Sequence, residues 1–221
     1  MIDSVYISFI PGNTREIFNI LCRQDFISKF TLVGGTALAL QVRHRLSEDL
    51  DFIYDGDTLN INSIKRNLAK IFPDYLVTRQ ENNEQLDLVI HGVRVTFFCS
   101  GMIALPFKVS EHVFSHKKMK ICTAGVIAVL KMAAIAHRNT MRDYYDLYWL
   151  TRYHFSLLDI ILRTKELIPN LSPVTYSETL VYTDDIEESD MRAHLQPQEQ
   201  ISKYQIAEFF TAELKKIIEQ I

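Results

Sequence analysis

The chain has 221 residues, of which 48% are hydrophobic and 23% charged, and this composition suits one compact domain or two small ones. Its formal net charge is -3, yet residues 1–165 carry 20 basic against 16 acidic side chains, an excess that permits a polyanionic ligand without arguing for nucleic acid. No apolar run approaches the roughly 20 residues that span a bilayer, and Asp3 and Ser4 stand where a secretion leader would be basic and apolar, so we expect a cytoplasmic protein with no membrane segment.

Helices and short strands are predicted in turn over the first half of the chain. Apolar residues at helical spacing predict a helix over 14–30, and an apolar run predicts a short buried strand over 30–33. After a glycine pair, Thr36 is expected to cap a helix that ends near Arg43. The other elements of this half are a helix capped by Asn62 or Ser63 and strands over 49–54, 85–90 and 93–99.

Beyond Pro106 the pattern turns helical. No internal repeat and no Gly/Ser linker interrupts the chain, so a boundary near residue 110 is expected to separate a core, residues 1–110, from a mainly helical lobe, residues 111–221, packed against it. The helices expected in that lobe cover 123–137, 141–153, 156–168 and 201–221. Together these elements predict an α+β protein.

The last part of the chain is acidic. Residues 166–221 hold 4 basic against 11 acidic side chains, and the acids are densest over 184–190. A solvated loop is the ordinary interpretation of such a run. Binding of a partner, or covering of a basic site, remains open as an alternative.

Two aspartates, Asp49 and Asp51, stand one residue apart at the start of a predicted strand. Side chains at positions i and i+2 of a strand point to the same face, so both carboxylates project together while Leu50 and Phe52 point into a core. Adjacent carboxylates repel each other unless a hard cation lies between them, and Mg²⁺ accepts two carboxylates together with substrate phosphates. An exposed strand edge with two unrelated acids is the alternative.

A glycine pair, Gly34 and Gly35, precedes these aspartates. Nucleotide phosphates need backbone N–H groups that no Cβ obstructs, and the start of the following helix at Thr36 adds partial positive charge. A tight turn without a ligand is the alternative for a lone glycine pair. Here thirteen residues separate Gly35 from Asp49, enough for one short helix and a return strand that would bring the carboxylates beside the glycines.

The glycine pair, about a dozen residues, and then Asp-apolar-Asp-apolar together resemble the DNA polymerase β-like nucleotidyltransferase superfamily. More narrowly, residues 34–38, His44-Arg45, Ser47 and residues 49–52 resemble the AbiEii toxin-like nucleotidyltransferases, the toxin halves of type IV toxin–antitoxin pairs. The resemblance implies a small mixed sheet flanked by helices, followed by a helical C-terminal lobe. It also implies transfer of a nucleotide from an NTP to an acceptor, for some relatives the 3' end of tRNA, with Mg²⁺ or Mn²⁺ as cofactor and a cognate antitoxin as partner.

A second block agrees with that family: Lys131, Arg138 and residues 142–147. In the family, the lysine and the aspartates of this block, Asp143 and Asp146 here, complete the nucleotide site. A lysine point charge suits a triphosphate, and aspartates at i and i+3 of a helix share a face. Solvent-facing salt bridges on two helix surfaces are the alternative.

One position departs from the superfamily pattern. Polymerase β-like enzymes usually place a third carboxylate on a neighbouring strand, and residues 93–97 there offer only Thr96. The His91-Gly92 dipeptide predicts a two-residue hairpin turn that pairs Asp87 with Thr96. Directly opposed residues have Cβ atoms about 5 Å apart, so we hypothesise that Asp87 supplies the missing acid and a third metal ligand. The competing hypothesis is a weakened site with two ligands.

The expected reaction is in-line transfer at the α-phosphate with pyrophosphate leaving. The roles are metal binding for Asp49, Asp51 and Asp87, phosphate contacts for Gly34, Gly35, Thr36, Arg45 and Ser47, and charge neutralisation for Lys131. Two other classes stay open. A degenerate relative would bind nucleotide or RNA without transfer, and the presence of Thr96 in place of an acid supports this hypothesis. An interaction module would bind a partner through the acidic tail.

Overall fold

The computed structural model describes residues 5–187 and 195–219, in two compact units that meet in sequence between Thr123 and Ala124. The first unit extends past the predicted boundary near residue 110 because a hairpin over 113–122 belongs to its sheet. The acidic run predicted over 184–190 lies outside the described residues from residue 188 onward, as do the last two residues of the predicted final helix.

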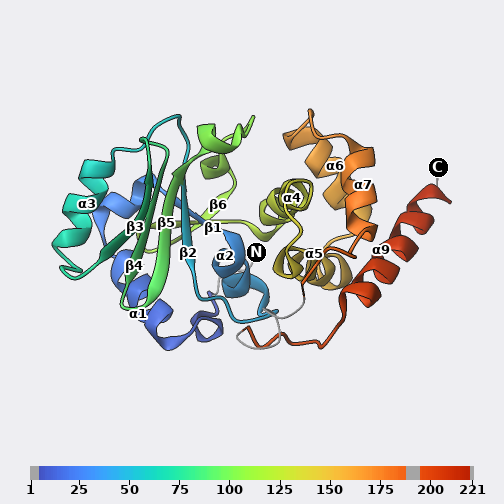
Figure 1. The fold of residues 1–221 in the computed structure, drawn as a ribbon, viewed down its shortest axis with the longest axis horizontal. Coiled ribbons are helices and arrows are strands. Elements are labelled where there is room, and N and C mark those ends of the chain that lie inside the picture. The colour runs from blue at the N-terminus through green and yellow to red at the C-terminus, as the bar shows by residue number, and fades with distance from the viewer. Residues whose placement is uncertain (1–4, 188–194, 220–221) are drawn as a thin grey trace. The chain divides into compact units, whose positions relative to one another are not determined.

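The first unit is built on a mixed sheet, and its described strands have the order β3-β4-β5-β2-β1-β7-β6 (Figure 1). The pairs β2–β5 and β1–β7 are parallel, and the other neighbours are antiparallel. With the helices described below, this is the α+β class that the sequence predicted. The strand bounds are β1 Thr31–Val33, β2 Leu50–Tyr54, β3 Leu76–Glu81, β4 Gln85–Ile90, β5 Val93–Cys99, β6 Val113–His116 and β7 Met119–Cys122.

The hairpin of β4 and β5 has the predicted bounds and register, with Asp87 opposite Thr96. His91 and Gly92 both have positive φ, 47° and 80°, as a two-residue type I′ turn requires. Alternate side chains are buried on one face of the hairpin: Leu86, Leu88, Ile90, Val93, Val95 and Phe97. The polar face of the hairpin is therefore available to the functional site.

Three strands were not predicted. The prediction that the chain turns helical beyond Pro106 is wrong over 113–122, where β6 and β7 pair with each other and β7 joins β1. Both strands are only four residues long, and basic side chains obscure the apolar alternation of this edge hairpin. The edge strand β3 is exposed along nearly its whole length, so it too lacks the alternation that marks a half-buried strand.

The helices of the first unit differ from prediction chiefly at their ends. The helix predicted over 14–30 is α1, Gly12–Leu21, followed by a separate 3₁₀ turn, Asp25–Lys29, because Gln24 adopts an extended backbone between them. The helix α2, Gly34–Val42, begins at Gly34, so Thr36 is not its cap. The cap of α3, Ile61–Ala69, is Asn60, whose side chain accepts a hydrogen bond from the backbone N–H of Ser63.

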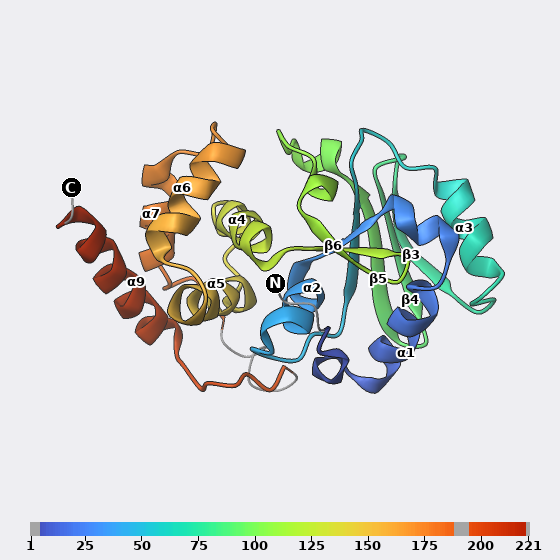
Figure 2. The same cartoon turned by 180° about the vertical axis from the view of Figure 1, so that it is seen from behind.

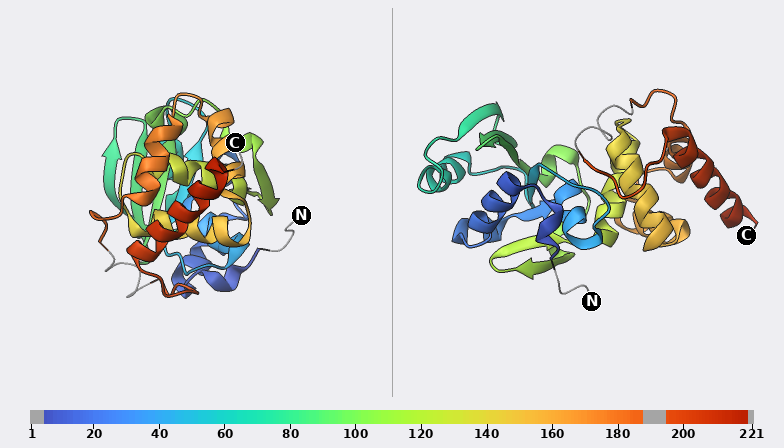
Figure 3. Two further views of the ribbon diagram at one scale, coloured as in Figure 1. Left: turned by 90° about the vertical axis from the view of Figure 1, so that its right-hand side faces the viewer. Right: turned by 90° about the horizontal axis from the view of Figure 1, so that it is seen from below.

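The second unit is helical as far as the structure describes it (Figure 2). Its described helices are α4 Ala124–Ile135, α5 Met141–Tyr153, α6 Leu157–Leu167, α7 Pro173–Val181 and α9 Lys203–Ile218. The helix α4 packs against α5, α6 and α7, and α9 runs beside α5 and α7 (Figure 3). The bounds of α5 match the prediction, whereas α7 was not predicted. Within the described residues, no helix combines the length and apolarity needed to cross a membrane.

Candidate active site

The start of α2 lies against the second aspartate of the motif. Val33, the last residue of β1, pairs with Asp51 in β2, and Gly34 follows it with φ of +73°. An added Cβ at Gly34 would stand 2.8 Å from Oδ2 of Asp51, which is closer than real Cβ contacts allow. Val33 occupies the N-cap position and supplies no capping side chain, so the first N–H groups of α2 remain suited to phosphate oxygens.

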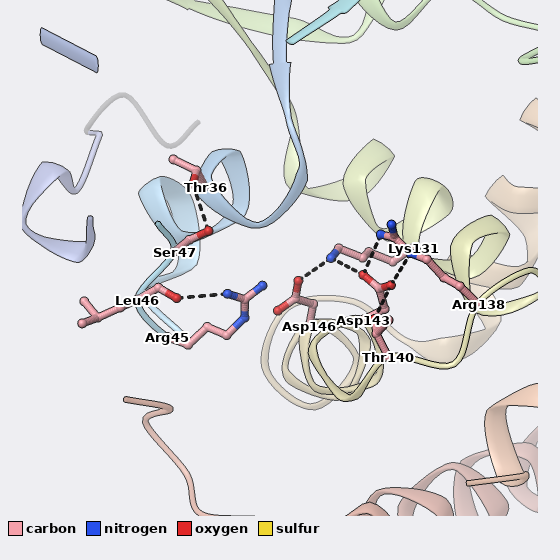
Figure 4. Close-up of polar contacts among 9 residues, drawn as sticks. All are labelled: Thr36, Arg45, Leu46, Ser47, Lys131, Arg138, Thr140, Asp143 and Asp146. Carbon is pink, nitrogen blue, oxygen red and sulfur yellow. Dashed lines mark hydrogen bonds and ion pairs between the residues drawn. The ribbon is translucent and has the colours of Figure 1, made fainter. Parts of the chain in front are cut away.

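The loop between the two motifs is tied to the first turn of α2. The hydroxyl of Thr36 bonds the hydroxyl of Ser47 at 2.9 Å (Figure 4). It also bonds the backbone carbonyl of Asp49. An added Cβ at Gly35 would stand 2.6 Å from Nη2 of Arg45 and 2.9 Å from Oγ of Ser47. Arg45 and Ser47 are nearly fully buried. The structure thus brings the predicted phosphate-contacting residues of this loop together with the glycines, and their contacts hold Asp49 in register.

A basic residue that the sequence analysis did not select contacts the first aspartate. Nη2 of Arg94, in β5, lies 2.8 Å from Oδ2 of Asp49. The hydrogen bond and charge of Asp49 raise the pKa of Arg94, and the charges of Asp51 and Asp87 add to the effect. Arg94 therefore lies in the field of all three predicted carboxylates. The signal was present in the hairpin register, because Arg94 precedes Thr96 by two residues and so shares its face.

Asp87 lies in one row of the sheet with Asp51, but Thr96 stands between them. Thr96 pairs with Asp51 across β5 and β2 and with Asp87 across β5 and β4. Two strand spacings place the backbones of Asp51 and Asp87 about 10 Å apart. Nε2 of Gln85 donates to both carboxylate oxygens of Asp87, at 2.8 and 3.0 Å. In the part of the chain that the structure describes, no three His, Cys, Asp or Glu side chains converge as metal ligands, so Asp87 is not grouped with Asp49 and Asp51 as the predicted third ligand.

The pair Asp49 and Asp51 nevertheless has the chemistry of a Mg²⁺ or Mn²⁺ site. Mg²⁺ is commonly held by one or two carboxylates and completes its shell with substrate phosphates and water. The close approach of Gly34 to Asp51 leaves room beside the carboxylate that any side chain at Gly34 would fill. The residues present therefore fit a divalent ion that arrives with a phosphate substrate.

In the second unit, Lys131 of α4 is buried and bonded to two aspartates of α5. Its Nζ lies 2.5 Å from Oδ1 of Asp143 and 2.6 Å from Oδ2 of Asp146 (Figure 4). Asp143 also accepts hydrogen bonds from Nε of Arg138, at 2.9 Å, and from the hydroxyl of Thr140, at 2.7 Å. Burial alone would raise the pKa of Asp143, but the charges of Lys131 and Arg138 outweigh it and lower that pKa.

The burial of this network shows that the alternative, salt bridges that face solvent, is wrong. The side chains of Lys131, Asp143 and Asp146 are each exposed by less than a tenth. Two carboxylates face two cations, Lys131 and Arg138, so the charges balance. The structure thus brings together all the residues predicted from the second block and fixes the lysine ammonium in one position.

Comparison with known proteins places these two groups of residues in one family. The profile of the family described as "Nucleotidyl transferase AbiEii toxin, Type IV TA system" matches residues 17–217, which include the glycines, the aspartate pair and the Lys131 network. The chain belongs to this family. It is therefore a nucleotidyltransferase of a toxin–antitoxin family, as the motif resemblance predicted.

An uncharacterized protein of Aquifex aeolicus (strain VF5) is 27% identical to this AbiEii-family chain over 211 residues, which cover 93% of this chain and 96% of the relative. The solved structure of MenT4, a nucleotidyltransferase toxin of Mycobacterium tuberculosis H37Rv, has a TM-score of 0.54 at 14% identity and covers 93% of this chain and 86% of its own. MenT4 therefore shares the fold. The Megavirus polyadenylate synthase has a TM-score of 0.44 at 14% identity over 64% of this chain and 32% of its own.

Proposed function

We propose that this AbiEii-family nucleotidyltransferase depends on Mg²⁺ or Mn²⁺ and moves an NMP from an NTP to a hydroxyl group of an RNA acceptor. The observation that supports this most directly is the contact between Gly34 and Asp51. It sets the N–H groups at the start of α2, which suit phosphate oxygens, beside a carboxylate pair that suits a divalent ion. A triphosphate bound with its metal ion needs both.

In the proposed reaction, a bond forms between the acceptor oxygen and the α-phosphorus while the bond to the β-phosphate breaks and pyrophosphate leaves. Asp49 and Asp51 would hold the divalent ion, which would supply charge neutralisation at the phosphate oxygens and polarisation of the acceptor hydroxyl. The α2 N–H groups orient the phosphates, and the bonds from Thr36 hold Asp49 in place. We assign to Asp87, which stands two strands away from Asp51, the role of accepting the proton of the acceptor hydroxyl.

The Lys131 network is proposed to serve nucleotide binding, as the family resemblance implies. A lysine held by Asp143 and Asp146 meets a phosphate in one fixed geometry, which lowers the entropic cost of binding. The charges of Lys131 and Arg138 outweigh the effect of burial and lower the pKa of Asp143, which keeps that carboxylate ionised at neutral pH. Arg45 and Ser47 are proposed to support phosphate binding by packing their loop against Gly35.

Family membership supports the proposed partner, and the charge of the chain supports the proposed acceptor. Membership of a type IV toxin–antitoxin family supports a cognate antitoxin as the protein partner, and the cytoplasm is where NTPs and RNA would meet the enzyme. The modest basic excess of residues 1–165 is compatible with an RNA acceptor.

The test is to incubate the purified protein with each α-labelled NTP, MgCl₂ or MnCl₂, and total RNA, and to resolve labelled RNA on a gel. Wild type and the matched control Asp74→Asn, an exposed carboxylate outside the site, should label RNA with at least one NTP. Asp51→Asn, and wild type with EDTA, should not. Undiminished transfer by Asp51→Asn would reject the assignment. Nucleotide binding without any transfer by wild type would favour a binding module, for which Thr96 in place of an acid is the argument.

A further inference from the structure

We infer that Arg94 is the counter-cation of Asp49 in the metal-free protein, and that a divalent ion displaces its guanidinium toward a phosphate of the acceptor in the adjoining pocket. The inference rests on the proposed function in one respect, because it takes Asp49 as a metal ligand. It assigns Arg94 to positioning and to acceptor binding, roles that couple the metal ion and the acceptor.

The first support is the direct contact. Nη2 of Arg94 lies 2.8 Å from Oδ2 of Asp49, and so occupies an oxygen that a metal ion would use. A guanidinium and a divalent cation on one carboxylate repel each other at short range. Metal binding must therefore either break this ion pair or be weakened by it.

The second support is that the pair can open at little cost. The side chain of Arg94 is 56% exposed and that of Asp49 is 27% exposed, and exposed ion pairs contribute little to stability. The backbone of Arg94 pairs with Val89 of β4, and the next residue, Val95, pairs with Leu50 of β2. The side chain can thus move without any change in the sheet.

The third support is the space beside the pair. A pocket of about 480 Å³ is lined by Asp49 and Arg94, by the first turn of α1 and by the turn between β4 and β5. An added Cβ at Gly12 or Gly92 would meet nothing within 4 Å, so no other atoms cover the pocket at these two glycines. Among the described residues that line this pocket, which include the acidic Glu48, Arg94 is the basic one, and a guanidinium released from Asp49 binds a phosphate group with two parallel hydrogen bonds. The backbone phosphate of a nucleic acid acceptor has that chemistry.

Metal binding without nucleotide tests the counter-cation. Mn²⁺ is titrated into the full chain and the free ion is followed by electron paramagnetic resonance, for wild type, Arg94→Gln and Arg79→Gln. Arg79 is the matched control, because it is 52% exposed, lies in β3 of the same sheet and pairs with Glu81 instead. Arg94→Gln should bind Mn²⁺ about two- to five-fold more tightly than Arg79→Gln, the range expected for loss of one exposed ion pair. Equal or weaker binding would overturn the inference.

Acceptor binding tests the release. A fluorescent short RNA with a free 3'-hydroxyl is titrated with and without Mn²⁺, in the absence of NTP. Mn²⁺ should raise the RNA affinity of wild type and Arg79→Gln and leave that of Arg94→Gln nearly unchanged. An equal gain in all three proteins would overturn the proposed role of Arg94 at the phosphate.

Asp51→Asn separates failure of this inference from failure of the proposed function. If wild type does not bind Mn²⁺, or Asp51→Asn binds it equally well, the metal site is wrong and the inference fails with it. If Asp51→Asn loses Mn²⁺ while Arg94→Gln behaves as Arg79→Gln, only the inference on Arg94 fails. Thermal unfolding followed by circular dichroism checks that each variant is folded.

Discussion

Gly34 and Asp51 lie so close that a methyl group on Gly34 would stand 2.8 Å from the carboxylate oxygen Oδ2. The contact arises because β1 and β2 are antiparallel and pair Val33 with Asp51. The chain leaves β1 directly into α2, so the residue after Val33 meets the carboxylate. This contact explains how the glycine pair and the aspartate pair, which are separated in sequence, come to lie side by side.

Gly34→Ala should abolish Mn²⁺ binding and nucleotide transfer, because its methyl group would displace the Asp51 carboxylate. Gly92→Ala is the matched control: Gly92 also has positive φ, but its added Cβ meets nothing within 4 Å. Both variants should lose about 1–2 kcal/mol from backbone strain, seen as a lower Tm. Only Gly34→Ala should lose metal binding, measured by Mn²⁺ titration; an active Gly34→Ala enzyme would contradict the geometry.

Thr36→Val should weaken the loop that carries Asp49. The valine keeps the shape of threonine but removes the bonds to Ser47 and to the carbonyl of Asp49. We expect a loss of about 1–3 kcal/mol in the free energy of unfolding, measured by urea denaturation, together with weaker Mn²⁺ binding. Thr36→Ser keeps the hydroxyl and should stay near wild type in metal affinity. If the serine variant behaves as the valine variant does, the hydroxyl is not what positions Asp49.

Asp87→Asn tests the third acid. If Asp87 takes the proton of the acceptor hydroxyl, the variant should lower kcat at least about a hundredfold, the low end for loss of a general base, with little change in NTP affinity. Asp74→Asn serves again as the control. Adding Thr96→Asp to Asp87→Asn should restore part of the rate, since it places a carboxylate directly beside Asp51. Full activity of Asp87→Asn would show that the site works with two acids, Asp49 and Asp51, and would reject the role of Asp87.

Lys131→Met should destabilise the protein by about 3–5 kcal/mol, because it leaves two buried carboxylates short of a cation. Chemical denaturation measures the loss, and Lys165→Met, an exposed lysine of α6, should have little effect. A triple variant that also carries Asp143→Asn and Asp146→Asn removes the uncompensated charge. It should recover stability but not NTP binding; recovery of NTP binding as well would show that Lys131 is purely structural.

Stability should depend on pH through Asp143. Its pKa in the folded protein is lowered below the ordinary 3.8, because the charges of Lys131 and Arg138 outweigh the effect of burial. A carboxyl group with a lowered folded pKa stabilises the protein above its unfolded pKa, and that stability is lost as the pH falls through the folded pKa. Between pH 7 and 3, the Tm difference between wild type and Asp143→Asn should therefore narrow below about pH 4. A constant difference would contradict the ionised network.

Local pattern was sufficient for several elements. The hairpin of β4 and β5 was predicted to the correct register because strict alternation and a His-Gly turn act over neighbouring residues. The helix α5 was predicted to the residue. The edge strands β3 and β6 were not predicted, because a strand at the solvent-exposed edge of a sheet does not need apolar alternation.

The site shows the same division. The glycines, the aspartate pair and the lysine block could be selected because chemistry and spacing mark them in the sequence. Arg94 was not selected, although it shares the polar face of the hairpin with Thr96, because its contact with Asp49, 45 residues away, depends on the parallel pairing of β2 with β5. The burial of Lys131 was equally hidden, because a charged residue on a helix looks the same in sequence whether it faces water or two carboxylates.

The sequence by itself determined the family, the strands β1, β2, β4 and β5, most of the described helices, and the residue types that a nucleotidyltransferase requires. Those properties depend on side-chain chemistry and short-range periodicity. Only the tertiary structure decided that Thr96 stands between Asp51 and Asp87, that Arg94 neutralises Asp49, and that Lys131 is committed to Asp143 and Asp146. Each of these depends on which strands and helices become neighbours, and that choice is set by burial of the whole core rather than by any local pattern.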